Sequence, residues 1–199
     1  PYSVADNMSQ SLSEDVENVR ALIDAADGPV LLVGHSYGGA VITNAGRHDE
    51  VRGLVYVAAF APTEGETVSG IVDAYPEAEV SAFMERGPDG EWISSDSPEA
   101  RAALSWDIPE EIWQRRFEDS RVSSDAIFTE PTGVPAWRTL PSWYILATND
   151  KHIRVEAQRD MAARAGATVV ETDTSHAVPH AAPALVVDVI ERALADLSA

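Results

Sequence analysis

The sequence of 199 residues contains no cysteine and a single lysine, Lys151. The absence of cysteine excludes disulfide bonds and metal sites built on thiolates. Only 14 lysines and arginines stand against 33 aspartates and glutamates, which gives a formal net charge of −19. A surface of this charge repels phosphate backbones and anionic lipid headgroups. We therefore expect neither a nucleic acid nor a membrane surface as a partner.

Long hydrophobic runs are also missing. No apolar stretch approaches the roughly 20 residues that a membrane-spanning helix needs, and the opening residues, PYSVADNMSQ, lack the pattern of a signal peptide. We therefore expect a cytoplasmic location. Hydrophobic residues make up 45% of the chain, which is ordinary for a globular protein with one sizeable core.

The most informative stretch is the one from Pro29 to Val41, PVLLVGHSYGGAV. Its apolar run, Val30 to Val33, predicts a strand that is buried on both faces. The residues from Gly39 to Asn44 continue with helix-compatible spacing. The pattern G-x-S-x-G lies between the two, and in this context it is typical of a nucleophile elbow, a strained turn that lifts a serine above a sheet. The alternative is a glycine-rich turn with an incidental serine.

An elbow at this position assigns roles to its residues. Ser36 would be the nucleophile. Gly34 and Gly38, two positions before and after it, would be needed because crowded backbone leaves no room for a Cβ atom. The N–H of Tyr37 would stand at the start of the following helix, where it can donate to an oxyanion.

Helices and strands alternate on both sides of this stretch. Ser11 and Glu14 are spaced as a capping box at the start of a helix that Gly28 and Pro29 end. The other predicted elements are strands at 51–60, 142–147 and 168–172 and helices at 155–165 and 183–197. Four strands with helical connections predict a mostly parallel, doubly wound α/β sheet.

The segment from 62 to 141 interrupts this alternation. It is rich in proline, holds four of the five tryptophans (Trp92, Trp106, Trp113 and Trp137), and predicts short helices at 97–104 and 109–117. We interpret it as a helical cap inserted into a core formed by 1–61 and 142–199. The tryptophans would either pack a small core of the cap or line a pocket above the serine.

Three reactive side chains follow three of the predicted strands, namely Ser36, Asp150 and His176. Ligands and catalytic groups gather at the carboxyl ends of strands in such sheets. A serine hydroxyl needs a base to take its proton, histidine has a suitable pKa, and a carboxylate orients the imidazole. The order serine, acid, histidine along the chain is that of α/β-hydrolases.

Several residues compete for these roles. Asp173 is the main rival for the acid, but it lies close in sequence to His176; Asp125 and Glu130 in the cap are more distant rivals. Among the histidines, His35 is expected to point away from the serine's face if the turn is regular. His48 and His180 are expected to lie in loops, and His152 follows the candidate acid. His176 and His180 have a spacing that metal sites use, but Pro179 disfavours a helix there, so no metal site is expected.

The segments GHSYGGAV, LVYVAAFAP, PSWYILATND and SHAV together resemble the α/β-hydrolase superfamily. More narrowly, the chain is similar to small bacterial esterase-like members related to the plant methylesterase and hydroxynitrile lyase group, from about Ser11 to its end. The resemblance implies the α/β-hydrolase fold, a triad of Ser36, His176 and Asp150, a mechanism without a cofactor, and an ester or related acyl substrate.

The chain departs from this group in two places. Ala177 follows the histidine where the lyase branch has a lysine, which argues against cyanohydrin cleavage. The group also has about twice as many strands, with an H-G loop before the elbow that supplies the second oxyanion donor. We expect this sequence to be the C-terminal portion of a longer chain whose first strands are missing.

The leading hypothesis is a serine hydrolase that cleaves a small or medium ester through an acyl-enzyme. A cofactor-free lyase or perhydrolase that uses the same three residues is one alternative. A ligand-binding protein that has lost turnover is another. The only partner predicted is the small-molecule substrate, and a homodimer is left open.

Overall fold

The main sheet has four parallel strands, and their positions agree with the sequence analysis. The computed structural model describes residues 2–5, 10–88, 92–118 and 123–198. The strands are β1 (Val30–Ser36), β2 (Val51–Ala59), β5 (Ser142–Ala147) and β6 (Thr168–Thr172). They lie side by side in the order β1-β2-β5-β6. The predicted parallel α/β sheet is therefore confirmed.

The helices that cover the sheet also lie close to their predicted positions. They are α1 (Leu12–Asp24), α2 (Gly38–Ala45), α7 (Val155–Arg164) and α9 (Pro183–Leu197). α1 begins as its capping box predicts, because the Ser11 Oγ accepts a hydrogen bond of 3.1 Å from the Glu14 N–H. Its residues Leu12, Val16, Val19 and Ile23 are buried on one side of the helix, which packs against α2.

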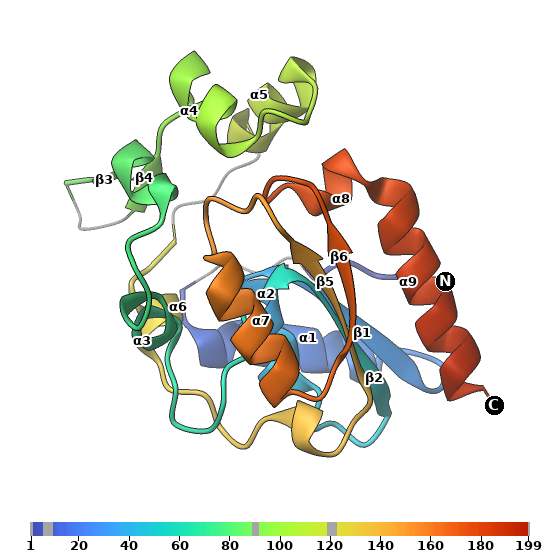
Figure 1. Ribbon diagram of the computed structural model, residues 1–199. Helices are drawn as coiled ribbons and strands as arrows, with labels where there is room; N and C mark the ends of the chain where they lie inside the picture. Colours follow the sequence, from blue (N-terminus) through green and yellow to red (C-terminus); the bar gives the residue numbers. More distant parts are fainter. Residues whose placement is uncertain (1, 6–9, 89–91, 119–122, 199) are drawn as a thin grey trace.

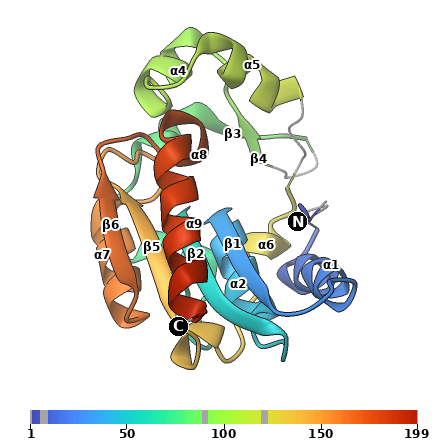
Figure 2. The ribbon, with the colours of Figure 1, turned by 90° about the vertical axis from the view of Figure 1, so that its right-hand side faces the viewer.

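The two faces of the sheet carry separate cores. On one face, α1, α2 and α7 pack against strand residues that include Leu32, Leu54 and Tyr144. On the other face, α9 packs against Val55, Val57 and neighbouring residues. The two views show this layering, with α9 on one side of the strands and α7 on the other (Figure 1), and α9 running along the sheet in front of β2 and β5 (Figure 2).

The segment between β2 and β5 is more structured than the sequence predicts. Two of its helices, α4 (Pro98–Leu104) and α5 (Glu110–Glu118), correspond to the predicted ones. The remaining elements are α3 (Val68–Asp73), η1 (Glu79–Phe83), β3 (Met84–Arg86), β4 (Trp92–Ser94), α6 (Ala126–Thr129) and η2 (Ala136–Arg138). Strands β3 and β4 form a small antiparallel pair. The division into 1–61, 62–141 and 142–199 stays a prediction.

Helices α4 and α5 lie beyond the carboxyl ends of the strands (Figure 1). They share a small apolar core formed by Ala100, Leu104, Ile108 and Trp113 together with Ala177, which follows His176. Of the four tryptophans in this segment, Trp113 alone is part of that core. Trp106 is 51% exposed, Trp137 packs against the main core, and Trp92 stacks under the Arg86 guanidinium.

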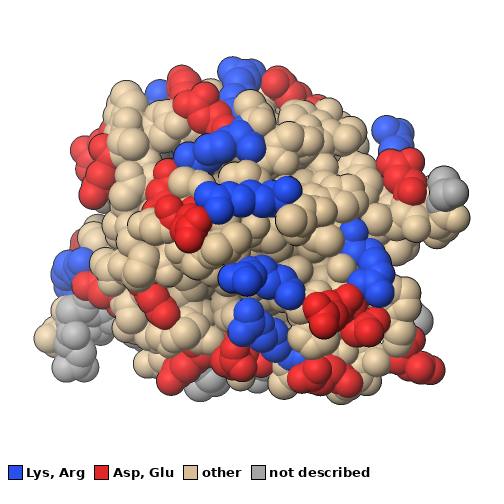
Figure 3. Space-filling model, turned by 90° about the horizontal axis from the view of Figure 1, so that it is seen from below, with Lys and Arg blue, Asp and Glu red and all other residues tan. Residues whose placement is uncertain are grey.

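The opposite end of the molecule shows basic side chains beside acidic ones (Figure 3). The structure forms ion pairs such as Arg138–Glu64 at 2.7 Å and Arg164–Glu66 at 2.8 Å. Arg138 and Glu64 are about half exposed, so this pair contributes about 1 kcal/mol or less to stability. Among the residues that the structure describes, no helix combines the length and apolar character that crossing a membrane requires.

Candidate active site

The elbow begins at the last residue of β1. Ser36 has a φ of 54°, in the left-handed region that non-glycine residues rarely adopt. The pairing of β1 with β2 shifts register between His35 and Ser36, so the strand ends in an irregular turn directly before α2. Strain of this kind is typical of functional turns.

The glycines around Ser36 differ in what they do. A Cβ atom on Gly34 would lie 2.5 Å from the carbonyl oxygen of Gly38, so the predicted steric requirement is confirmed there. The same argument is wrong for Gly38, where a Cβ would meet nothing within 4 Å. The second crowded position is Gly39, whose Cβ would lie 2.3 Å from the carbonyl oxygen of Phe60. Helix α2 approaches the end of β2 at Gly39, and sequence spacing alone did not show this contact.

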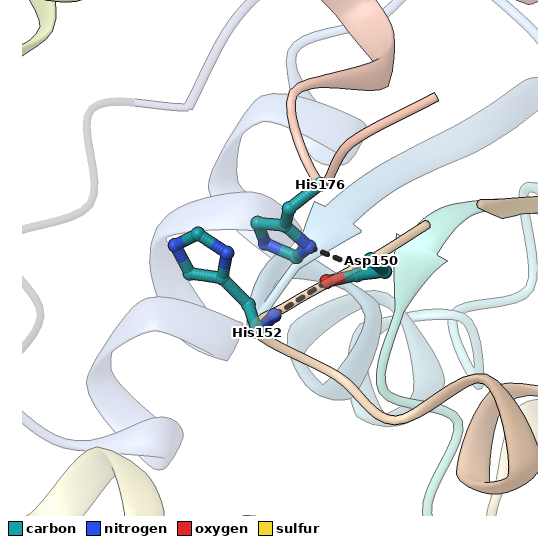
Figure 4. Close-up of side chains that lie close together, drawn as sticks. All are labelled: Asp150, His152 and His176. Atoms are coloured by element: carbon teal, nitrogen blue, oxygen red, sulfur yellow. Dashed lines mark hydrogen bonds and ion pairs between the residues drawn. The ribbon is translucent and has the colours of Figure 1, made fainter. Parts of the chain in front are cut away.

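Asp150 and His176 meet at the carboxyl ends of β5 and β6. The Nδ1 atom of His176 lies 2.7 Å from Oδ2 of Asp150, and both side chains are buried (Figure 4). The rival acid, Asp173, is exposed and accepts hydrogen bonds from the Thr148 hydroxyl and the Asn149 amide. Of these two aspartates, the structure pairs the histidine with Asp150.

Both carboxylate oxygens of Asp150 accept further hydrogen bonds. Oδ1 accepts from the backbone N–H groups of His152, at 2.7 Å, and Ile153, at 2.9 Å. Oδ2 accepts from the side-chain amide of Gln158 at 2.8 Å, in addition to its contact with His176. Burial raises the pKa of Asp150 from 3.8 to about 6, against the lowering effect of His152 and the two backbone donors.

The loop that carries His176 returns across the sheet to the elbow. β2 and β5 lie between β6 and β1, yet Nε2 of His35 lies 2.8 Å from the carbonyl oxygen of His176. The two imidazole rings are 4.7 Å apart at their centroids. His35 therefore contacts the residue proposed as the base. Its expected direction away from the serine assumed a regular turn, and the bulge between His35 and Ser36 breaks the regular alternation of side chains there.

A third histidine completes this group. The rings of His152 and His176 are stacked, with centroids 4.4 Å apart and planes inclined by 18° (Figure 4). Asp150, His152 and His176 have potential metal-ligating atoms within 4.8 Å of one another. However, the nitrogen lone pairs of two stacked imidazole rings run parallel and do not converge on one point. The Asp150 carboxylate also already accepts hydrogen bonds on both of its oxygens. This arrangement fits a hydrogen-bonded histidine better than a metal centre.

Tyr37 connects the elbow to α1. Its backbone is the N-cap of α2, and its hydroxyl donates to Oδ2 of Asp15 at 3.0 Å. Asp15 is fully buried. Burial and the adjacent Asp15 carboxylate raise the pKa of the Tyr37 hydroxyl, so the phenol stays protonated as a donor.

The other candidate residues lie outside this group. His48 contacts Asp24 at 2.9 Å, Asp125 pairs with Arg86 at 2.7 Å, and Glu130 accepts from the Ser13 N–H at 3.0 Å.

His180 is exposed in α8 (Val178–Ala181). The prediction that Pro179 prevents a helix is wrong, since proline sits in the first turn of α8, where an N–H has no intrahelical partner.

The sequence matches the alpha/beta hydrolase family over residues 2–189. The chain belongs to the alpha/beta hydrolase family. An alpha/beta hydrolase of Aspergillus novofumigatus, nvfD, is 28% identical over 197 residues, which cover 91% of this chain and 77% of that protein. Lipase LipV of Mycobacterium tuberculosis is also 28% identical, over 92% of this chain and 76% of the lipase.

Solved structures of this fold superimpose on this α/β hydrolase over most of its length. The pyrethroid hydrolase of Sphingobium faniae JZ-2 covers 92% of the chain, and 77% of its own chain, with a TM-score of 0.75 and 22% identity. The methylesterase MES16 of Arabidopsis gives a TM-score of 0.70 at 19% identity, over 93% of this chain and 78% of its own. The predicted fold and the predicted resemblance to the α/β-hydrolase superfamily are confirmed.

Proposed function

We propose that this α/β hydrolase cleaves small or medium carboxylic esters through an acyl-enzyme formed on Ser36. The observation that carries the proposal is the buried hydrogen bond of 2.7 Å between Asp150 and His176. The loop that carries His176 also contacts His35 of the elbow strand. Relatives named as a lipase and as a carbendazim-hydrolyzing esterase support an ester-like substrate.

The reaction assigns one step to each group. The Ser36 hydroxyl attacks the ester carbonyl carbon while Nε2 of His176 takes its proton, and the Tyr37 N–H donates to the developing oxyanion. Collapse of the tetrahedral intermediate breaks the bond to the alkoxy group, which leaves as the alcohol with the proton from His176. Water, activated by the same imidazole, then releases the carboxylic acid and restores Ser36.

Asp150 acts through His176. Its contact with Nδ1 holds the imidazole so that Nε2, on the opposite side of the ring, is the nitrogen that exchanges the proton. Because the pair is buried, the carboxylate stabilises the imidazolium more strongly than it could in water.

The test is intact-protein mass spectrometry before and after treatment with a fluorophosphonate, with Ser36→Ala as the matched variant. We expect one stoichiometric adduct on the wild-type protein and none on the variant, together with hydrolysis of short p-nitrophenyl esters. Cyanohydrin and peracid assays run beside the ester assay separate the lyase and perhydrolase alternatives. A wild-type protein that forms no adduct and hydrolyses no ester would contradict the proposal and favour a ligand-binding role.

A further inference from the structure

Gln158 is a buried polar side chain that forms a hydrogen bond with Asp150 of the Asp150–His176 pair. It is carried by α7, is 0% exposed, and makes three hydrogen bonds. Its Nε2 donates to Oδ2 of Asp150 at 2.8 Å and to the carbonyl oxygen of Ile153 at 3.0 Å. Its Oε1 accepts from the N–H of Ala147, the last residue of β5, at 3.2 Å.

These contacts determine the orientation of the amide. The two acceptors, the Asp150 carboxylate and the Ile153 carbonyl, face the NH₂ group of Gln158. The Ala147 N–H, which is a donor, faces its oxygen. Turning the amide over would place Oε1 against two acceptors and lose all three bonds. A buried amide without partners would be costly, so the site holds this side chain in one position.

We propose that Gln158 is a positioning residue for the proposed triad, which holds Asp150 Oδ2 in the plane and position that His176 Nδ1 requires. The inference rests on the proposed function. The same oxygen atom is shared by Gln158 and His176, so any displacement of the amide moves the acceptor of the imidazole N–H. Gln158 also ties this oxygen to β5 and to the loop after it, which fixes the acid relative to the sheet.

The charged and titratable groups around Asp150 make a neutral donor at this position important. The stacked rings of His176 and His152 lie on one side of the carboxylate. Against the raising effect of burial, His35 acts to lower the pKa of the Asp150 carboxyl. Besides burial, Asp150 in turn raises the pKa of the Tyr144 phenol. The neighbouring cation Lys151 pairs with Glu79 at 2.8 Å. Gln158 adds a hydrogen bond to this group without adding a charge.

The first variant is Gln158→Glu, which keeps the shape but replaces the donor by a second carboxylate. Two buried carboxyls at this distance share a proton, because each raises the pKa of the other, and the negative charge that the pair gains when it loses this proton stabilises the imidazolium of His176. We expect the acid limb of the kcat/KM profile and the NMR titration midpoint of His176 to rise by about one pH unit or more. Gln114→Glu is the matched control, because Gln114 is exposed on α5, where it contacts Glu110. It adds the same charge and should leave both midpoints unchanged.

The second variant is Gln158→Met, which keeps the volume and removes every hydrogen bond of the side chain without introducing charge. We expect kcat to fall roughly ten- to a hundredfold, the scale of one lost hydrogen bond to a charged group, while KM stays within about twofold. A folded Gln158→Met protein with wild-type kcat would overturn the proposal.

A third measurement needs no variant, so it decides the matter even if both substituted proteins fail to fold. In the wild type, the side-chain amide resonances of Gln158 should move with pH and share the midpoint of the His176 imidazole. Resonances that stay fixed across that titration would overturn the inference. Both NMR readouts are independent of turnover. If Ser36 forms no adduct, the proposed function fails while the coupling between Gln158 and the pair is still measured.

Discussion

Nε2 of His35 lies 2.8 Å from the carbonyl oxygen of His176, although the two residues are 141 positions apart in the sequence. The contact joins the elbow strand at one edge of the sheet to the loop that follows the strand at the other edge. It joins the loop of the proposed base to the residue directly before the proposed nucleophile.

Asp150→Asn should lower kcat by about 10⁴-fold, because an amide favours the wrong tautomer of the histidine and cannot stabilise the imidazolium. The folded structure should persist, since the asparagine oxygen can still accept from the backbone N–H groups of His152 and Ile153. The measurement is the rate of ester hydrolysis together with the rate of fluorophosphonate labelling. Asp173→Asn is the control and should leave both rates unchanged. Equal losses in the two variants would mean that the wrong acid has been assigned.

The raised pKa of Asp150 predicts a pH dependence of activity. The carboxyl group has a pKa of about 6 in the folded protein, so the Asp150–His176 pair should take up a proton as the pH falls through this value. A protonated carboxyl no longer stabilises the imidazolium, and ester hydrolysis should decline below about pH 6. A kcat/KM profile measured from pH 4 to 9 checks this. A profile that stays flat down to pH 4.5 would contradict it.

The same shift predicts a pH dependence of stability, with a definite sign. The folded pKa of Asp150 lies above the ordinary value of 3.8, so the folded state binds this proton more tightly than the unfolded state does. Its contribution to stability is therefore complete below about pH 4 and is lost as the pH rises through 6. Relative to Asp150→Asn, the wild type should lose about 2 kcal/mol of unfolding free energy between pH 4 and pH 7. Urea denaturation of both proteins at several pH values measures the difference, and a difference that grows in the opposite direction would refute the assignment.

The two elbow glycines should respond differently to substitution by alanine. Gly34→Ala places a Cβ 2.5 Å from a backbone oxygen, and should destabilise the fold by about 1–3 kcal/mol or more. Gly38→Ala meets nothing within 4 Å in the first turn of α2, and should raise stability by about 0.4–1 kcal/mol. Thermal and urea unfolding of the pair provide the comparison. Destabilisation by both substitutions to the same degree would show that the crowding around Ser36 is not as described.

Tyr37→Phe should distinguish the role of the Tyr37 hydroxyl from that of its backbone N–H. Removing the hydroxyl takes a donor from the buried carboxylate of Asp15, so unfolding free energy should fall by about 1–3 kcal/mol. The backbone N–H that is proposed to hold the oxyanion is retained, so the fluorophosphonate adduct on Ser36 should still form. Loss of labelling in a protein that remains folded would assign the phenol, and not the N–H alone, to the reaction.

Local patterns in the sequence were sufficient to predict the elements of the sheet. Apolar runs marked the strands β1, β2 and β5, and the Ser11–Glu14 spacing marked the start of α1. G-x-S-x-G after a buried strand predicted the elbow, because a strained turn between strand and helix needs a small residue where Gly34 meets the backbone of Gly38. These features depend on residues close in sequence, whose preferences act before any long-range contact forms.

Only the tertiary structure decided which groups meet. The approach of His35 and His152 to His176 depends on loops that run across the ends of the strands. The burial of Gln158 behind the acid depends on how α7 packs against β5. Gly39 rather than Gly38 is the second crowded position because α2 approaches the end of β2 there. Apart from the Gln158–Asp150 hydrogen bond, these contacts join residues tens of positions apart. Their geometry follows from the packing of the whole sheet, which no local pattern encodes.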